Sequence, residues 1–82
     1  MKQLKSYKTT TFADGDFRID IVEKKNEYEA WIFHKDYGAK NFMFGAGKQI
    51  ETFDSFVDLV EANLATYKRI YKDEHFETVY NG

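Results

Sequence analysis

A glycine-rich segment of this chain ends in a lysine, a combination that can bind phosphate. Residues 45–48 read GAGK. A phosphate-binding loop also needs a glycine five residues before its Gly-Lys pair and a Ser or Thr directly after it. Phe42 and Gln49 occupy those places. We therefore expect a flexible connection between elements, with Lys48 as a contact residue at most and no nucleotide cofactor.

Two acidic segments have the residue types of metal sites but not the pattern. Residues 14–16 (DGD) lack the later ligands of a calcium loop, and a tight turn explains both acids. Residues 73–77 (DEHFE) group three acids with His75, and a solvated helix end explains them better than a metal does. The chain has no Cys, which excludes disulfides and thiolate metal sites. We expect no metal and no cofactor.

Nucleophiles and bases are scarce. The only His residues are His34 and His75, and the only Ser residues are Ser6 and Ser55. Ser55 is expected in the first turn of a helix, and His34 at an exposed turn. No motif joins them into a catalytic triad, so we predict no catalytic residue and no enzymatic activity.

Length and composition suit one small domain over residues 1–82. The chain has 8 Phe, 6 Tyr and 1 Trp, enough aromatic surface to build a small core. Its 12 Lys and Arg against 14 Asp and Glu give a net charge of −2, which disfavours nucleic acid or a membrane surface as the main partner. The chain has no apolar segment long enough to predict a membrane span. Together with the lack of Cys, this favours the cytoplasm.

The hydrophobic period changes from two to 3.6 residues along the chain. Strands are predicted at about 7–13, 16–23, 27–35 and 40–45, and a helix at about 53–73 with Thr52 as its N-cap. The tail, 74–82, fits helix, strand or disorder equally well. The expected fold is α+β, with two layers. A four-stranded antiparallel meander is followed by one long C-terminal helix across one face (ββββα).

The turns set the expected register. A type I′ turn at Asp14-Gly15 and a three-residue loop at 24–26 place the largest aromatic residues under the helix. These are Trp31, Phe33, Phe42 and Phe44. A two-residue loop at Lys25-Asn26 would instead turn Trp31 and Phe33 to the other face.

The expected register leaves one sheet face open, with an apolar centre and a polar rim, as at protein interfaces. The candidate partner-binding residues on this face are Tyr28, Ile32, Met43, Arg18 and Val22. A second candidate surface is the acidic flank of the helix, formed by Glu51, Asp54, Asp58 and Glu61.

These features predict a small, non-enzymatic protein-binding module. In size and mild acidity the chain resembles the accessory proteins of phages and mobile elements. That resemblance implies binding and inhibition of a larger host protein, such as a CRISPR or restriction nuclease. One alternative is a homodimeric structural domain with the open faces packed together. Another is a small nucleic-acid-binding domain that uses Lys2, Lys5, Lys8, Lys35, Lys40 and Lys48.

Overall fold

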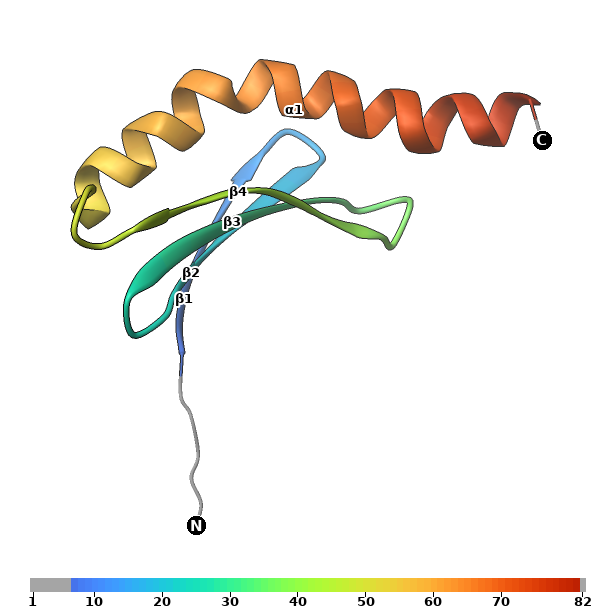
Figure 1. The fold of residues 1–82 in the computed structure, drawn as a ribbon. Coiled ribbons are helices and arrows are strands. Elements are labelled where there is room, and N and C mark those ends of the chain that lie inside the picture. The colour runs from blue at the N-terminus through green and yellow to red at the C-terminus, as the bar shows by residue number, and fades with distance from the viewer. Residues whose placement is uncertain (1–6, 82) are drawn as a thin grey trace, which may run out of the picture.

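The computed structural model describes residues 7–81, and side chains from residue 7 to His75. Four strands form one antiparallel sheet in the order β1-β2-β3-β4, and one helix follows (Figure 1). Their bounds are β1 Lys8–Asp14, β2 Phe17–Glu23, β3 Glu27–His34, β4 Lys40–Gly47 and α1 Phe53–Asn81. The predicted ββββα fold is confirmed.

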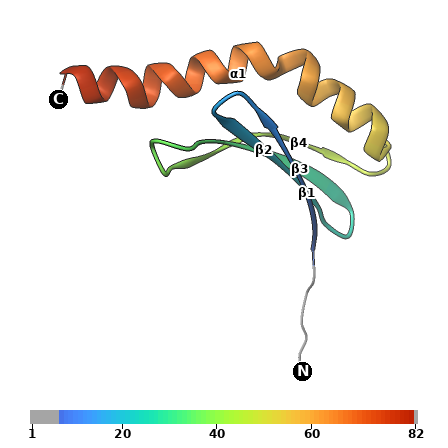
Figure 2. The ribbon, with the colours of Figure 1, turned by 180° about the vertical axis from the view of Figure 1, so that it is seen from behind.

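Helix α1 lies across one face of the sheet, packs mainly on β3 and β4, and continues past the sheet (Figures 1 and 2). It ends at Asn81 rather than near residue 73, because the tail contains no Gly or Pro before Gly82. No helix in the described part of the chain has the length and apolarity that crossing a membrane requires.

Thr52 caps the helix, as predicted. Its Oγ1 accepts a hydrogen bond from the Ser55 amide at 3.1 Å, and its own amide donates to Ser55 Oγ at 2.9 Å. The two residues therefore satisfy each other's backbone donors in the manner of a capping box.

The core lies between α1 and the sheet. One stripe of α1 faces the sheet, as the 3.6-residue period predicts: Phe56, Val60 and Tyr71 are buried, and Phe53, Val57, Leu64 and Tyr67 pack against the core. The Tyr71 hydroxyl donates to the Ala39 carbonyl, so its polar end is satisfied. The sheet contributes Phe17, Ile19, Ile21, Tyr28, Ala30, Ile32 and Met43.

The first turn is shifted by one residue from the prediction. Asp14 pairs with Phe17, so Gly15 and Asp16 are the central residues of the turn. Gly15 has a φ of 64° and Asp16 has no positive φ, which is the type II′ pattern and not type I′. Phe12 consequently lies opposite Ile19 rather than Phe17, but stays on the helix side of the sheet.

The second turn differs in a way that matters more. The Lys24 amide donates to the Glu27 carbonyl at 2.9 Å, which leaves only Lys25 and Asn26 between the paired residues. The predicted three-residue loop is therefore wrong, and Ile19 faces Ile32 instead of Trp31. Because side chains alternate along a strand, this single residue exchanges the two faces of β3.

A β-bulge in β4 completes the rearrangement. Trp31 pairs with Phe42 and Ala30 with Phe44, so Met43 is the extra residue. Met43 is buried, and the Phe44 ring lies 5.5 Å from that of Phe56. Of the four aromatic residues expected under the helix, only Phe44 is there.

The same exchange of faces buries His34, which we expected at the surface. Its ring makes edge contacts with Phe17 at 4.8 Å and Tyr37 at 5.2 Å, and its Nδ1 accepts from the Asp36 amide at 3.1 Å. The imidazole is a packed core group with a satisfied acceptor.

The register yields a testable prediction about β3. Ile32 is only 1% exposed, so Ile32→Ala should lower the free energy of unfolding by about 2–5 kcal/mol. Trp31→Ala, on the open face, should cost about 1 kcal/mol. Urea unfolding followed by circular dichroism measures both. A larger loss for Trp31→Ala than for Ile32→Ala would contradict the register.

Candidate functional site

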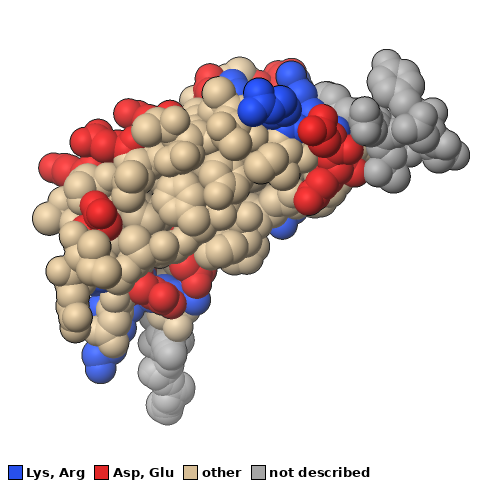
Figure 3. Space-filling model, turned by 45° about the horizontal axis from the view of Figure 1, so that its top comes forward, with Lys and Arg blue, Asp and Glu red and all other residues tan. Residues whose placement is uncertain are grey.

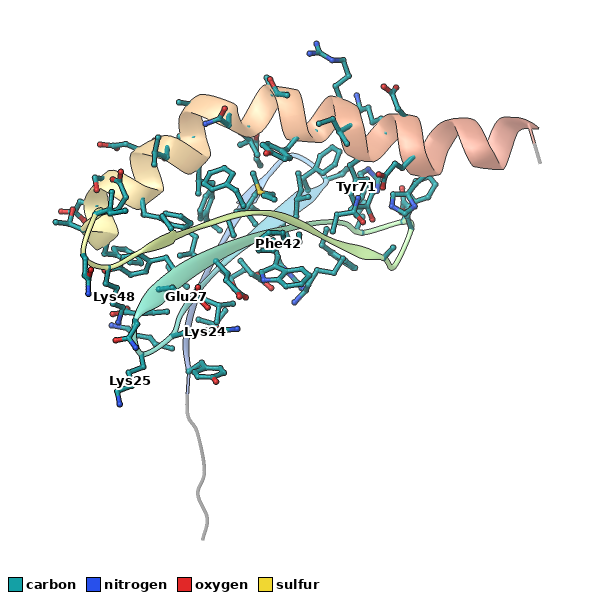
Figure 4. All side chains as sticks on the ribbon, viewed as in Figure 1. Lys24, Lys25, Glu27, Phe42, Lys48 and Tyr71 are labelled. Atoms are coloured by element: carbon teal, nitrogen blue, oxygen red, sulfur yellow. The ribbon has the colours of Figure 1, made fainter. Side chains whose placement is uncertain are left out.

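The open face of the sheet, on the side away from α1, holds the side chains that the core does not use. We define the aromatic patch as Trp31, Phe33 and Phe42, which lie on this face of β3 and β4. Figure 4 shows the contrast between the two faces, with Tyr71 between helix and sheet and Lys24 on the side away from the helix. An antiparallel sheet usually presents a polar face to water. Aromatic rings on this face therefore call for an explanation, with Phe42 exposed and Trp31 and Phe33 half-buried.

Trp31 and Phe42 form the centre of the patch. They are direct cross-strand partners, and their ring centroids lie 5.2 Å apart at an interplanar angle of 68°. This edge-to-face arrangement is the one that aromatic quadrupoles favour. Phe42 is 50% exposed, so the pair offers apolar surface while each ring is held by the other.

Arg18 covers the third ring of the patch. Its guanidinium carbon lies 4.6 Å from the centroid of Phe33, its direct partner in the β2–β3 ladder. Its Nε lies 3.5 Å from a carboxylate oxygen of Asp20. The stacked guanidinium gives this end of the patch a flat, cationic surface.

Asp20 is the buried anchor of the open face. Its carboxylate accepts hydrogen bonds from Thr11 Oγ1 at 2.9 Å and from Lys40 Nζ at 3.0 Å. Lys40 lies on β4 and Asp20 on β2, so the lysine side chain crosses β3 between Trp31 and Phe33. Burial acts to raise the pKa of Asp20, but these hydrogen bonds and the charges of Lys40 and Arg18 outweigh it and hold the pKa below its usual value.

Glu29 orients the indole. Trp31 Nε1 donates to one carboxylate oxygen at 3.2 Å, and Lys24 Nζ donates to the other at 2.9 Å. The hydrogen bond from Lys24 is the main cause of the lowered pKa of Glu29. The Lys24 ammonium also lies 5.5 Å from the ring centroid of Tyr7. The polar atom of the tryptophan is thus satisfied inside the face.

A groove of about 730 Å³ lies at the β2–β3 turn, close to where Figure 4 labels Lys24, Lys25, Glu27 and Lys48. Two of its four lysines are held in ion pairs, Lys48 with Glu23 at 3.2 Å and Lys24 with Glu29. The Lys48 amide donates to the Asn26 carbonyl at 2.9 Å, so it extends the strand pairing and does not form part of a phosphate cradle. The groove is lined by Tyr7, Lys8, Glu23, Lys24, Lys25, Asn26, Glu27 and Lys48.

The predicted sheet-face residues divide between the two faces. Arg18 and Val22 lie on the open face. Tyr28, Ile32 and Met43 are 6%, 1% and 5% exposed beneath α1, so their prediction as surface contacts is wrong. The same change of register that places Trp31 and Phe33 on the open face places these side chains beneath α1.

The acidic flank lies where it was expected. Asp54, Asp58 and Glu61 are exposed on the outer side of α1, and Figure 3 shows acidic side chains along the first half of the helix. Glu51 is half-buried and accepts a hydrogen bond from Ser55 Oγ.

The lysines expected for a nucleic-acid site do not form a track in the described residues. Lys35 pairs with Asp16 at 3.5 Å, Lys40 with Asp20 and Lys48 with Glu23. Lys8 lies at the start of β1, and Lys2 and Lys5 fall outside the described residues.

Comparison with protein families, characterised proteins and solved structures gives no match for this chain. Within the described part of the chain, no three His, Asp or Glu side chains come together as metal ligands would. The candidate site is therefore defined by its own geometry. Sequence reasoning missed Trp31, Phe33 and Phe42, and the signal for the first two was the alternative two-residue loop at Lys25-Asn26.

Asp20 makes a prediction about pH. Folding lowers the pKa of Asp20, so its ionised carboxylate stabilises the fold at pH values above the ordinary pKa of 3.8. This stabilisation is lost as the pH falls from 3.8 through the lower pKa of the folded state. Asp20→Asn should be about 1–2 kcal/mol less stable than the native chain at neutral pH. The difference should shrink as the pH drops below 3.8.

Urea unfolding at several pH values measures the difference. Asp16→Asn is the matched control, because it removes a carboxylate whose side chain is 58% exposed in a surface ion pair. A gap for Asp20→Asn that stays constant down to the lowest pH would contradict the assigned role.

Proposed function

We propose that this chain is a small, non-enzymatic module that binds another protein through the open face of its sheet. The observation that carries the proposal is the edge-to-face pair of Trp31 and Phe42, with Phe42 half exposed at the centre of a face that α1 does not cover. Tryptophan, other aromatic side chains and arginine supply most of the binding energy at protein interfaces.

The polar neighbours of the patch support this proposal because they fix its shape. Glu29 holds the Trp31 indole, and Asp20 holds Arg18 and Lys40. Side chains that are ordered before binding lose little conformational entropy when a partner arrives. A polar rim of this kind around apolar rings is typical of a protein interface.

The charges favour a protein over nucleic acid. Arg18 and Lys40 share the Asp20 carboxylate, and Lys24 is paired with Glu29. A phosphate backbone would have to compete with both carboxylates and would be repelled by them. An apolar protein surface meets neither obstacle.

A finer form of the proposal is inhibition of a larger host protein, such as a CRISPR or restriction nuclease. Its support is the acidic flank, because residues 49–67 contain four acids and no Lys or Arg. Such a row of carboxylates competes with nucleic acid for a basic groove of a partner.

The main proposal predicts a loss of binding on mutation of the patch. A tagged double variant, Trp31→Ala with Phe42→Ala, should lose a protein that the native chain captures from lysate. Ile50→Ala is the control, because Ile50 is 81% exposed but lies outside the patch, between β4 and α1. Circular dichroism verifies the fold of each variant.

A second readout uses the only tryptophan of the chain, Trp31. Binding of the captured protein, once purified, should shield Trp31 fluorescence from acrylamide. The proposal is overturned if the captured protein binds the double variant as tightly as the native chain. It is also overturned if single-stranded oligonucleotides, and not the protein, shield Trp31.

The finer form predicts a different response. Reversal of charge at Asp54, Asp58 and Glu61 should slow association about tenfold and weaken its salt dependence, with dissociation little changed. Stopped-flow mixing at two salt concentrations measures this effect. Unchanged association rates would remove the acidic flank from the proposal.

A further inference from the structure

The two edges of the sheet are not equally protected against pairing with another strand. The β4 edge carries the bulge at Met43, which interrupts a ladder, and α1 packs on that strand. The β1 edge has an uninterrupted register from Lys8 to Asp14. Its central segment, residues 9–13 (TTTFA), contains no charge, proline or glycine. Natural proteins rarely leave such an edge free.

The hairpin geometry tells which backbone groups this edge presents. Asp14 and Phe17 flank a two-residue turn, and such a flanking pair exchanges hydrogen bonds within the hairpin. Because bonded and non-bonded positions alternate, Phe12, Thr10 and Lys8 also bond toward β2. The amides and carbonyls of Thr9, Thr11 and Ala13 therefore point outward.

These outward groups match those of a second copy of the same strand. The midpoint of β1 is Thr11. Antiparallel pairing with full overlap places Thr11 opposite Thr11 of the other copy and Thr9 opposite Ala13. Each of these opposed residues has its N–H and C=O directed at the other, whereas a slip by one residue opposes outward groups with inward ones.

The charges of β1 are complementary in the same register. The only charged residues of the strand are Lys8 at its start and Asp14 at its end, and full antiparallel overlap brings them together at both ends of the pair. Asp14 also pairs with Lys68 of its own helix at 2.9 Å, so its carboxylate is already directed to the helix side, where Lys8 lies. Phe12, which is half-buried, would be covered by Thr10 of the other copy.

We propose that two copies of this chain pair through their β1 edges to form one continuous antiparallel sheet of about eight strands. The two-fold axis of such a pair is perpendicular to the sheet, so both helices lie on one side and both aromatic patches on the other. This dimer differs from the face-to-face dimer considered from the sequence, because it leaves the open faces free.

The mass in solution tests the dimer. Light scattering at increasing protein concentration should give twice the chain mass of 9.7 kDa. Thr11→Pro should give a folded monomer, because it removes an outward N–H that β2 does not use. Thr11→Val is the matched control, since it loses the same hydroxyl contact with Asp20 but keeps the N–H, and it should remain dimeric.

The charge pairs are tested by mixing. Lys8→Glu and Asp14→Lys each oppose like charges at both ends of the dimer and should each weaken it about tenfold. When the two variants are mixed, each end again joins a carboxylate to an ammonium, so a mixed dimer should form in preference to either homodimer. Mixed and single dimers that form equally well would overturn the proposed register.

Hydrogen exchange keeps the proposal falsifiable if Thr11→Pro does not fold. In the native chain the amides of Thr9, Thr11 and Ala13 should be protected at high protein concentration and exchange freely on dilution. A chain that stays monomeric at all concentrations overturns the proposal. A dimer that is lost in the Trp31→Ala, Phe42→Ala double variant but kept in Thr11→Pro overturns it in favour of face-to-face packing.

Discussion

The backbone hydrogen bond from Lys24 to Glu27 determines which side chains this protein buries. It closes the β2–β3 turn over two residues, and in a strand of alternating side chains the turn length decides which face each residue joins. With this turn, Tyr28, Ala30 and Ile32 lie beneath α1. One residue more would have placed Trp31 and Phe33 there instead.

This turn length divides the aromatic residues into two groups, one in the core and one on the open face. Phe17, Phe56 and Tyr71 fill the core, where burial of their rings supplies the stability that so short a chain needs. Trp31, Phe33 and Phe42 stay outside, where Asp20 and Glu29 anchor the polar groups around them. The exposed ion pairs of this network add little stability, and the buried Asp20 carboxylate adds only about 1–2 kcal/mol. Its larger effect here is to keep the rings and Arg18 in one arrangement.

Local patterns predicted the elements well, and the reason is physical. The stripe from Phe53 to Tyr71 has the period of a helix, and Thr52 has the hydroxyl that a helix start needs. The register was harder because β3 is apolar on both faces. Its sequence, EYEAWIFH, offers Tyr28, Ala30 and Ile32 on one side and Trp31 and Phe33 on the other. Because neither side of β3 is polar, the alternation of its side chains does not indicate which side is buried.

Neither the turn nor the bulge carried a residue that would have settled the register. Lys25 and Asn26 both have negative φ, so the β2–β3 turn needs no glycine. It therefore has no glycine to mark its position, as the first turn has. The bulge at Met43 brings two adjacent side chains to the helix side, which a strict period of two does not allow. For this reason Trp31, Phe33 and Phe42 were predicted in the core, whereas their pairing places them on the open face.

A partner on the open face and a second copy at the β1 edge can bind together, because the face and the edge are separate surfaces of the same sheet. The aromatic patch has only three rings, whereas stable interfaces bury about 1,200–2,000 Å² in total. Pairing of two β1 strands would place the two β3 strands five strand spacings apart, or roughly 24 Å. A partner long enough or symmetric enough to touch both patches would gain the second contact at a high effective concentration. A modest patch on one chain then suffices, provided that the edge brings a second chain beside it.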